Sequence, residues 1–302
     1  MSSSAPTSTA IPFAVATLGI ASFSTMDVMM KGLSISLGAY NAMLWRMIVG
    51  MVLGGALFLI TRTRWPARST FKLHVLRGSI AAFMALSFFW GLVRVPLAEA
   101  IALSFVAPLI TLYLAAVLLG EKISRTAIIA TVMGFVGVLV ILSARVTGEY
   151  QPEVLKGIAA ILFSAVFYAY NLVLQRQQAQ LASPIEIVFF QNLTAGSVLL
   201  VGAPWLAIVP DVSHAPAIVG STVTAVIALL LLSWAYARAE AQVLVPVEYT
   251  AFVWAALFGW YFYHEAVTAT TLVGTGLIVA GCVIAARQKP QAQPEHVEAV
   301  AL

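Results

Sequence analysis

The stretch WGLVRVPLAEAIALSFVAPLITLYLAAVLLGE, residues 90–121, organises the chain, because it returns in altered form as WAYARAEAQVLVPVEYTAFVWAALFGWYFYHE, residues 234–265. Both copies have an apolar run ending at a Trp and an Arg, a short polar break, and a second apolar run ending at a Glu. A repeat that has lost its sequence but kept its apolar pattern and its corner residues is typical of transporters built from two similar halves. One offset of 144 positions relates the landmarks: Trp90 and Trp234, Arg94 and Arg238, Glu121 and Glu265, and Gly137 and Gly281.

The composition predicts an integral membrane protein. Hydrophobic residues make up 61% of the 302 residues and charged residues only 9%, whereas soluble domains carry about 25% charged residues. The apolar runs are about 20 residues long, the length that an α-helix needs to cross a bilayer, and they lack the alternation of a barrel strand. The fold class we predict is therefore all-α, and the lone Cys282 excludes an intramolecular disulfide and a cysteine metal cluster.

Ten transmembrane helices are expected, in two five-helix repeats around a central cavity. The first repeat would occupy residues 11–143 and the second 154–286, with an inter-repeat loop at 144–153 and cytoplasmic tails at 1–10 and 287–302. The predicted spans are about 11–32, 38–61, 72–92, 97–119, 124–143, 154–175, 184–207, 214–236, 241–263 and 267–286.

The distribution of Lys and Arg predicts the orientation. With both termini in the cytoplasm, eleven basic residues fall on that side and four on the other, which is a positive-inside bias. Five spans per repeat is an odd number, so the second repeat enters the membrane from the opposite side and the repeat is inverted. The eleven are Arg62, Arg64, Arg68, Lys72, Arg77, Lys122, Arg125, Arg176, Arg238, Arg287 and Lys289, and the four are Lys31, Arg94, Arg145 and Lys156.

Several function classes are excluded by what the sequence lacks. The basic residues are spread over short loops, which argues against binding of nucleic acid. The sequence has no phosphate-binding GxxxxGK[ST] loop, no HExxH and no dinucleotide-binding fingerprint, so neither ATP-driven pumping nor a cofactor or metal is expected.

Asp27 and Arg46 are the clearest ionisable residues inside predicted spans. A charge at the bilayer centre costs about 2.5 to 3.5 kcal/mol on insertion scales, so each needs a reason to be there. The two fall at similar depth on neighbouring spans. Two interpretations stay open: a structural ion pair that holds spans 1 and 2 together, or a side chain in the cavity that meets a charged group of the substrate or carries a coupling proton.

Proline indicates a bend beside the third candidate, Glu248. Pro246 removes a backbone donor two residues before Glu248 and three before Tyr249, an arrangement suited to a binding site near a bend. Pro108 would bend the opposing span, with Ser104 one turn before it. The alternative is that Glu248 reaches the cytoplasmic helix end or pairs with Arg238.

Two helical stripes of polar and aromatic side chains are further candidates for the cavity lining. Ser164, Tyr168 and Asn171 share one face of span 6, and Phe83, Ser87 and Trp90 share a face of span 3. Hydrogen bonds between helices would explain the polar stripe equally well.

Two groups near span ends have a simpler alternative. For Trp90 and Trp234 an interfacial aromatic belt is the default explanation, and their matched positions add a stacking or gating role. His264 and Glu265 are expected to form a solvated turn rather than a metal site.

Two short motifs resemble the EamA family of the drug/metabolite transporter superfamily. They are Leu118–Lys122 (LLGEK) and His264-Glu265, and each is followed by an apolar segment with glycines. The resemblance covers about residues 11–286 and includes amino acid exporters of the YddG type and importers of S-adenosylmethionine or riboflavin. It implies a basket of helices with a cavity lined mainly by spans 1, 3, 4, 6, 8 and 9. The glycines are Gly134, Gly137, Gly274, Gly276 and Gly281.

From these observations we expect a secondary transporter of the bacterial cytoplasmic (inner) membrane. It would export amino acids, aromatic and other, or related small metabolites by alternating access, one half rocking against the other around Pro108 and Pro246. Its partners would be this small-molecule substrate and the lipid bilayer. The sequence does not determine the oligomeric state and is compatible with a monomer. One alternative is uptake of S-adenosylmethionine or riboflavin. Another is an intramembrane lipid-modifying enzyme, against which the absence of acidic or His pairs at metal-ligand spacing argues.

Overall fold

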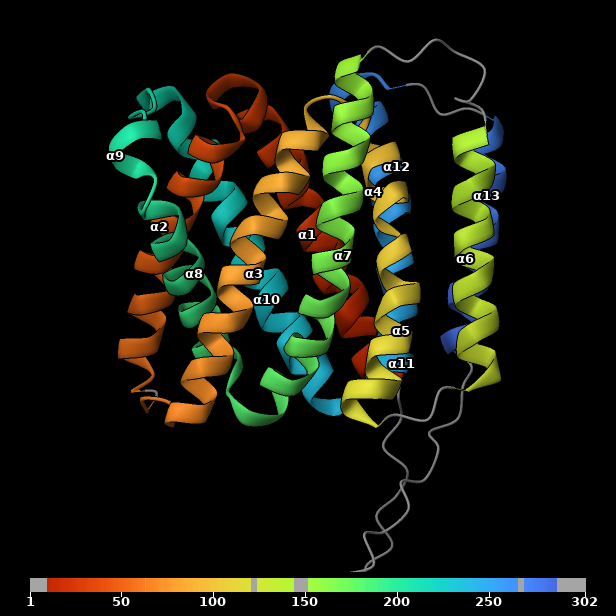
Figure 1. Cartoon of the computed structure of the whole chain (residues 1–302), viewed down its shortest axis with the longest axis horizontal. Helices are drawn as coiled ribbons and strands as arrows, with labels where there is room; N and C mark the ends of the chain where they lie inside the picture. The colour runs from red at the N-terminus through yellow and green to blue at the C-terminus, as the bar shows by residue number, and fades with distance from the viewer. Residues whose placement is uncertain (1–9, 63, 121–123, 144–151, 266–268, 287–302) are drawn as a thin grey trace, which may run out of the picture.

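The computed structural model describes residues 10–62, 64–120, 124–143, 152–265 and 269–286, and within these ranges every regular element is a helix (Figure 1). Both predicted tails, most of the inter-repeat loop, and Glu121 and Lys122 lie outside the described residues. The helices are α1 (Ala10–Leu37), α2 (Ala39–Ile60), α3 (Arg68–Leu92), α4 (Leu97–Ser104), α5 (Val106–Leu119), α6 (Arg125–Ser143), α7 (Pro152–Leu181), α8 (Pro184–Leu200), α9 (Ala203–Leu206), η1 (Val212–His214), α10 (Ala215–Arg238), α11 (Ala241–Leu244), η2 (Val245–Tyr249), α12 (Thr250–Tyr263) and α13 (Ala269–Ala286).

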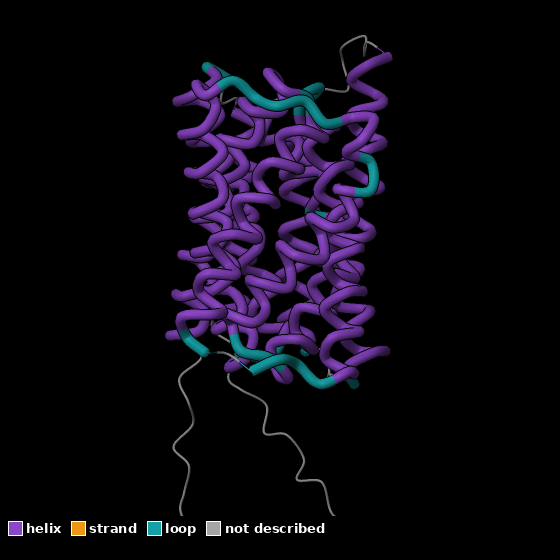
Figure 2. The backbone as a smooth tube through the Cα atoms, turned by 90° about the vertical axis from the view of Figure 1, so that its left-hand side faces the viewer, coloured by secondary structure: helices purple, strands orange, loops and turns teal. Residues whose placement is uncertain are grey.

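Helices occupy most of the described part of each of the ten apolar segments predicted from the sequence. Five helices are long and apolar enough to cross a membrane by themselves: α1, α2, α3, α7 and the η1–α10 unit. The longer helices run along one common direction, and loops gather at both ends of the molecule (Figure 2). The largest differences from prediction are at the ends of α8 and α7: α8 ends at Leu200, seven residues before the expected 207, and α7 continues six residues beyond the expected 175. Gln178, in this extension, is fully buried, so the polar sequence there packs inside the protein instead of leaving the helix bundle.

Two of the predicted spans are interrupted at equivalent positions. The fourth is divided into α4 and α5 at Phe105, and the ninth into α11, η2 and α12, with η2 ending at Tyr249. Phe105 and Tyr249 are related by the offset of 144 residues. Pro108 and Pro246 lie in or beside these interruptions, and a proline cannot donate the backbone hydrogen bond that would continue the helix.

Helix packing follows the same repeat. α1 packs against α10, and its equivalent in the second repeat, α7, packs against α3, the equivalent of α10. The self-equivalent pairs also meet: α2 packs against α8, and α6 packs against α13 at one edge of the molecule (Figure 1). Equivalent helices of the two repeats therefore make equivalent packing contacts.

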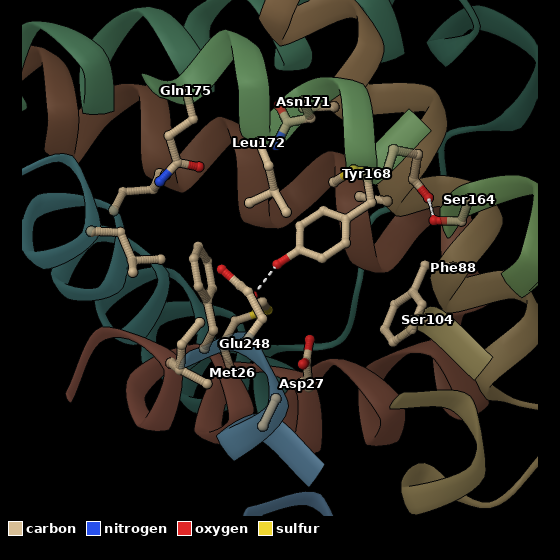
Figure 3. A pocket seen from close by; sticks show the side chains of 18 of the residues that line it. Met26, Asp27, Phe88, Ser104, Ser164, Tyr168, Asn171, Leu172, Gln175 and Glu248 are labelled. Carbon is tan, nitrogen blue, oxygen red and sulfur yellow. Dashed lines mark hydrogen bonds between the residues drawn. The ribbon is translucent and has the colours of Figure 1, made fainter. Parts of the chain in front are cut away.

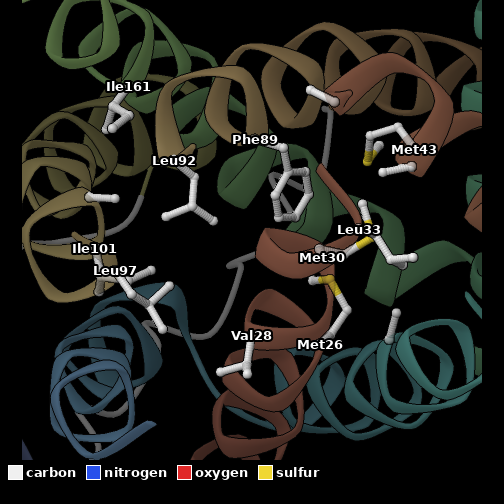
Figure 4. Packing of buried hydrophobic residues seen from close by; sticks show 14 of the residues in the cluster. Met26, Val28, Met30, Leu33, Met43, Phe89, Leu92, Leu97, Ile101 and Ile161 are labelled. Atoms are coloured by element: carbon white, nitrogen blue, oxygen red, sulfur yellow. The ribbon is translucent and has the colours of Figure 1, made fainter. Parts of the chain in front are cut away.

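The main apolar core joins α1, α2, α3 and α4, with contributions from α7 and α12. Met26, Met30 and Leu33 of α1 face Met43 of α2 and Phe89 of α3 in this core (Figure 4). Where α3 crosses α7, Gly91 and Gly157 lie so close that a Cβ atom at Gly91 would come within 2.7 Å of the Gly157 carbonyl oxygen. Small residues at such a crossing let two helix backbones approach closely in a membrane.

The Trp and Arg landmarks of the repeat form the same local structure twice. The Arg94 guanidinium lies 3.4 Å from the centre of the Trp90 ring and donates a hydrogen bond to the Trp90 carbonyl oxygen. The Arg238 guanidinium lies 4.0 Å from the Trp234 ring and donates to the Trp234 carbonyl oxygen. Each Arg thus covers the end of its own helix by a cation–π contact and a backbone hydrogen bond.

Candidate functional site

A cavity of about 190 Å³ is lined by residues of both repeats. All six spans named in the predicted lining contribute to it, and α2 and α8 contribute as well. Its wall combines aromatic and Met side chains with a few charged and amide groups, which is the usual character of a small-molecule site. The aromatic and Met residues that line it are Phe23, Met26, Met47, Met84, Phe88, Phe89, Phe105 and Tyr168.

The lining residues obey the repeat. Seven pairs of lining positions are related by the offset of 144, so the two repeats contribute equivalent positions to the cavity. Most pairs differ in chemistry although their backbones are equivalent, which gives the two sides of the cavity different polarity. The pairs are Ile20 and Ser164, Ser24 and Tyr168, Asp27 and Asn171, Met47 and Gln191, Ala85 and Leu229, Phe88 and Leu232, and Ser104 and Glu248.

Asp27 and Arg46 both line this cavity, but they do not form an ion pair with each other. Asp27 points into the space that Glu248 and Tyr168 also face (Figure 3). Arg46 is only 6% exposed, and its Nη2 reaches no closer partner than the Met43 Sδ at 3.6 Å. The predicted structural ion pair between spans 1 and 2 is therefore absent, and both charges face the cavity.

Glu248 is buried and accepts a hydrogen bond from the Tyr168 hydroxyl (Figure 3). The interruption at η2 places its carboxylate at the cavity wall, as the neighbouring Pro246 suggested. Its partner is on α7 and not, as the alternative interpretation had it, Arg238. Ser104, the equivalent residue of the first repeat, also lines the cavity and donates its hydroxyl to the Ala100 carbonyl oxygen at 3.0 Å.

Arg77 is a cavity residue that the sequence analysis assigned to the cytoplasmic surface. It is 2% exposed inside α3, and three side-chain amide oxygens of α7 accept its hydrogen bonds. A residue buried in this way is no topological marker. The signal that could have found it is the continuation of the α7 stripe at the same helical spacing. The acceptors are Asn171 at 3.2 Å, Gln175 at 2.9 Å and Gln178 at 2.5 Å.

The same polar network continues away from the cavity to α8. The Gln178 amide contacts the Nδ1 of His74 at 2.5 Å, and the His74 Nε2 lies 2.9 Å from the Glu186 carboxylate. The His74 ring stacks on Phe190 with a centroid distance of 4.7 Å. This chain of contacts joins α3, α7 and α8.

Some buried polar atoms of the cavity wall have no hydrogen-bond partner. They are the Nε of Arg46, the Nε2 of Gln175 and the Oε1 of Gln191, and all three residues line the cavity. Buried polar atoms are paired in the great majority of proteins, so unpaired ones call for an explanation. A polar ligand or water in the cavity would supply their partners.

Other predicted site residues lie away from the cavity lining. Phe83 is 56% and Trp90 38% exposed on the outer face of α3, and Ser87 donates to the Phe83 carbonyl oxygen on the same face. The second stripe therefore faces outward, which differs from the expectation. Trp234 is half-buried against Arg238, as described above. Tyr249 is fully buried in packing: its hydroxyl donates to the Thr131 carbonyl oxygen at 3.2 Å.

Ser164 and Asn171 lie in the lining as predicted, and each also holds α7 to α3. The Ser164 hydroxyl donates to the Met84 carbonyl oxygen at 2.7 Å, and Asn171 accepts from Arg77. Both readings of the α7 stripe, cavity lining and interhelical bonding, therefore describe these residues.

Glu265 is not part of a solvated turn. Its carboxylate forms an ion pair of 2.7 Å with the buried Lys31 and accepts the backbone N–H of Leu97 at the start of α4. The Lys31 ammonium also donates to the Val95 carbonyl oxygen at 3.2 Å and lies 5.0 Å from the Tyr263 ring centre. Glu265 and Lys31 thus join the ends of α1 and α12 to the beginning of α4. No group of metal-binding residues occurs in the described part of the chain.

A family model decides the classification. The model of the EamA-like transporter family matches residues 11–143 and again residues 155–287, nearly the whole chain as two copies. The chain belongs to the EamA family. It is therefore a membrane transporter of the drug/metabolite transporter type.

Relatives of this EamA protein transport different compounds. It is 26% identical over 279 residues to a pseudopaline exporter from Pseudomonas aeruginosa, covering 91% of this chain and 95% of that protein. It is also 26% identical over 269 residues to an S-adenosylmethionine uptake transporter from Rickettsia bellii, covering 87% and 88%. A crystal structure that is 22% identical, with a TM-score of 0.72 and 91% and 96% coverage, has the same fold. Export and uptake are thus both represented among proteins similar to this EamA chain.

Proposed function

We propose that this EamA protein is a secondary transporter that exports amino acids or related small metabolites across the bacterial cytoplasmic membrane by alternating access. The observation that carries the proposal is the lining of the cavity, which combines equivalent positions of the two repeats. Binding at a repeat interface beside interrupted helices is the usual arrangement in secondary transporters.

The proposed topology has ten spans and cytoplasmic termini. Five helices are long enough to cross the membrane, and five further spans would come from the shorter elements. These spans would be α6, α8, α13, α4 together with α5, and α11 together with η2 and α12. The positive-inside bias of the loop residues supports this orientation, and it remains clear when Arg77 is removed from the count.

The cavity favours an amino acid over larger substrates. Its volume of about 190 Å³ is below the range of about 300 to 1,000 Å³ that is usual for drug-sized ligands. Aromatic and Met side chains would surround the substrate side chain, while Asp27 or Glu248 would meet its amino group. Uptake of S-adenosylmethionine is the second candidate, because one group of similar proteins carries that name. The EamA relationship argues against a lipid-modifying enzyme.

Counterflow in proteoliposomes tests the proposal. Vesicles would be loaded with unlabelled Phe, Thr, Met, S-adenosylmethionine or riboflavin, and the entry of a trace of the same labelled compound would be followed with and without a pH gradient. We expect accumulation with several amino acids. Accumulation with S-adenosylmethionine or riboflavin alone would replace the substrate class, and no accumulation with any of them would contradict the proposal.

A further inference from the structure

Asp27 and Arg46 are opposite charges that line one cavity without a direct ion pair between them. The carboxylate of Asp27 accepts no hydrogen bond from the described residues, and the Arg46 guanidinium has only the weak contact to the Met43 sulfur. A buried charge is normally paired with an opposite charge or fully hydrogen-bonded, because desolvation is otherwise unfavourable by several kcal/mol. The buried Arg46 is therefore incomplete in the protein alone, and the partly buried Asp27 carboxylate is open toward the cavity.

Arg77, in the same cavity wall, is an arginine whose side-chain nitrogens all have hydrogen-bond partners in the protein. Its guanidinium donates to three amide oxygens from α7, and no side-chain nitrogen of Arg77 is without a partner. Arg46 is buried to a similar extent, yet its Nε has no acceptor. The contrast separates a structural arginine, which joins helices, from one that is available to a ligand.

Glu248 provides the same contrast among the carboxylates. Its carboxylate is bonded to Tyr168, whereas Asp27 remains open. The orphan carbonyl oxygen of Gln191 and the orphan amide nitrogen of Gln175 add one acceptor and one donor to the lining. The cavity therefore offers groups that recognise a positive and a negative charge at the same time.

We propose that Asp27 and Arg46 together form a zwitterion site that binds the α-ammonium and α-carboxylate of an amino acid group. The carboxylate of the ligand would pair with the Arg46 guanidinium, which favours planar carboxylates, and the ammonium would pair with Asp27. A purely cationic ligand would leave Arg46 without a counter-ion, and a purely anionic one would leave Asp27 without one. The site thus selects for both groups in one molecule.

This inference rests on the proposed function and narrows it, because it gives the two ends of the substrate different roles. The aromatic and Met side chains of the cavity wall would surround the substrate side chain with little discrimination. Selectivity would then reside in the common headgroup and explain transport of several amino acids by one protein. S-adenosylmethionine has the same headgroup, so this site alone does not separate the two candidates, whereas the cavity volume favours the smaller amino acids.

The test compares one amino acid with analogues that lack one charge. Purified wild-type protein would be titrated with L-phenylalanine, its methyl ester, phenethylamine and 3-phenylpropionate, with the thermal shift and competition in counterflow as readouts. We expect L-phenylalanine to bind on the order of ten- to a hundredfold more tightly than each analogue, the loss typical of a missing hydrogen bond to a charged group. Equal binding of phenethylamine or of 3-phenylpropionate would overturn the zwitterion site.

Variants assign each charge to its end of the ligand. Arg46→Gln should weaken L-phenylalanine and leave the methyl ester and phenethylamine unchanged, so that the preference for the free carboxylate disappears. Asp27→Asn should remove the preference over 3-phenylpropionate. Arg68→Gln, which changes an exposed arginine of α3, is the matched control and should behave as wild type. Equal weakening of every ligand by Arg46→Gln would overturn the assignment.

Folding and function are separated by two further readouts. Size-exclusion profiles check that each variant is folded. Arg46→Lys keeps the positive charge but lacks the planar guanidinium, so it should retain part of the preference for the free carboxylate. Wild-type protein without counterflow would contradict the proposed transport. The site would still stand if L-phenylalanine shifted the melting temperature of wild type but not that of Arg46→Gln. Counterflow that is indifferent to Arg46→Gln would contradict the site and leave transport intact.

Discussion

The ring of Phe105 packs edge-on against the ring of Tyr249, with a centroid distance of 4.8 Å and an interplanar angle of 74°. These two residues are equivalent in the repeat, and each lies where a predicted span is divided into shorter helices. The two interruptions therefore contact each other through equivalent residues. The contact continues beneath the cavity, since Phe105 also lines it.

The packing behind this contact is tight, and Gly134→Ala should disturb it. A Cβ atom at Gly134 would lie 2.6 Å from the Tyr249 ring, which is fully buried and bonded to Thr131. We expect a loss of about 1 to 3 kcal/mol in the free energy of unfolding, typical of overpacking, measured by thermal or denaturant unfolding in detergent. Gly276→Ala is the control, because a Cβ there meets nothing within 4 Å. Equal effects of the two substitutions would contradict the packing argument.

Removing Arg77 should destabilise the protein through the amides that it holds. Arg77→Met deletes three hydrogen bonds and leaves Asn171, Gln175 and Gln178 with buried unpaired oxygens. We expect a loss of at least about 3 kcal/mol in unfolding free energy, since a hydrogen bond to a charged group contributes about 1.5 to 3 kcal/mol. Arg68→Met on the exposed part of the same helix should change stability little. If Arg77→Met unfolded at the same temperature as Arg68→Met, the network would not be structural.

Tyr168→Phe should uncouple the cavity carboxylate from α7. The change removes the hydrogen bond that the Tyr168 hydroxyl donates to Glu248 and leaves the buried carboxylate without that partner. We expect a loss of about 1 to 3 kcal/mol in stability and at least about tenfold slower counterflow. Tyr113→Phe, at a residue that is 69% exposed, provides the matched control. Wild-type counterflow rates in Tyr168→Phe would show that this hydrogen bond has no part in transport.

The ion pair of Lys31 and Glu265 should be worth more than a surface pair. A double-mutant cycle with Lys31→Met and Glu265→Gln would measure its coupling, and the glutamine keeps an acceptor for the Leu97 N–H. We expect a coupling of more than about 1 kcal/mol, because both side chains are largely buried. The exposed pair of Lys156 and Glu153 is the comparison, for which about 0 to 1 kcal/mol is usual. A Lys31–Glu265 coupling no larger than that of the exposed pair would contradict the prediction.

The sequence predicted the helices and the repeat well because long apolar runs and fixed offsets depend on the membrane and on the fold alone. It also placed Asp27, Glu248 and Tyr168 in the cavity lining, since intramembrane polar groups seek polar surroundings. It did not reveal which side chains pair. Asp27 and Arg46 are neighbours in span order, but depth along the membrane does not determine whether two side chains turn toward each other.

The outward stripe of α3 shows a second limit of sequence interpretation. Ser87 is polar, but its hydroxyl donates a hydrogen bond to the Phe83 carbonyl oxygen of its own helix. It can therefore face lipid without an unpaired polar group. Phe83 and Trp90 are compatible with either environment. Arg77 was misassigned for the opposite reason: the amides that satisfy it lie about 100 positions further along the chain, where only the continued α7 stripe indicates them.

The Arg77 network also restricts which parts can move as units during transport. α3 belongs to the first repeat and α7 to the second, and they are joined by Arg77, by the Ser164 bond to Met84, and by the close contact of Gly91 with Gly157. Separating the two halves of the sequence along this seam would expose a buried cation and its amide acceptors to hydrocarbon. A rigid body that moves in the proposed alternating-access cycle would therefore keep α3 and α7 together and combine helices of both repeats.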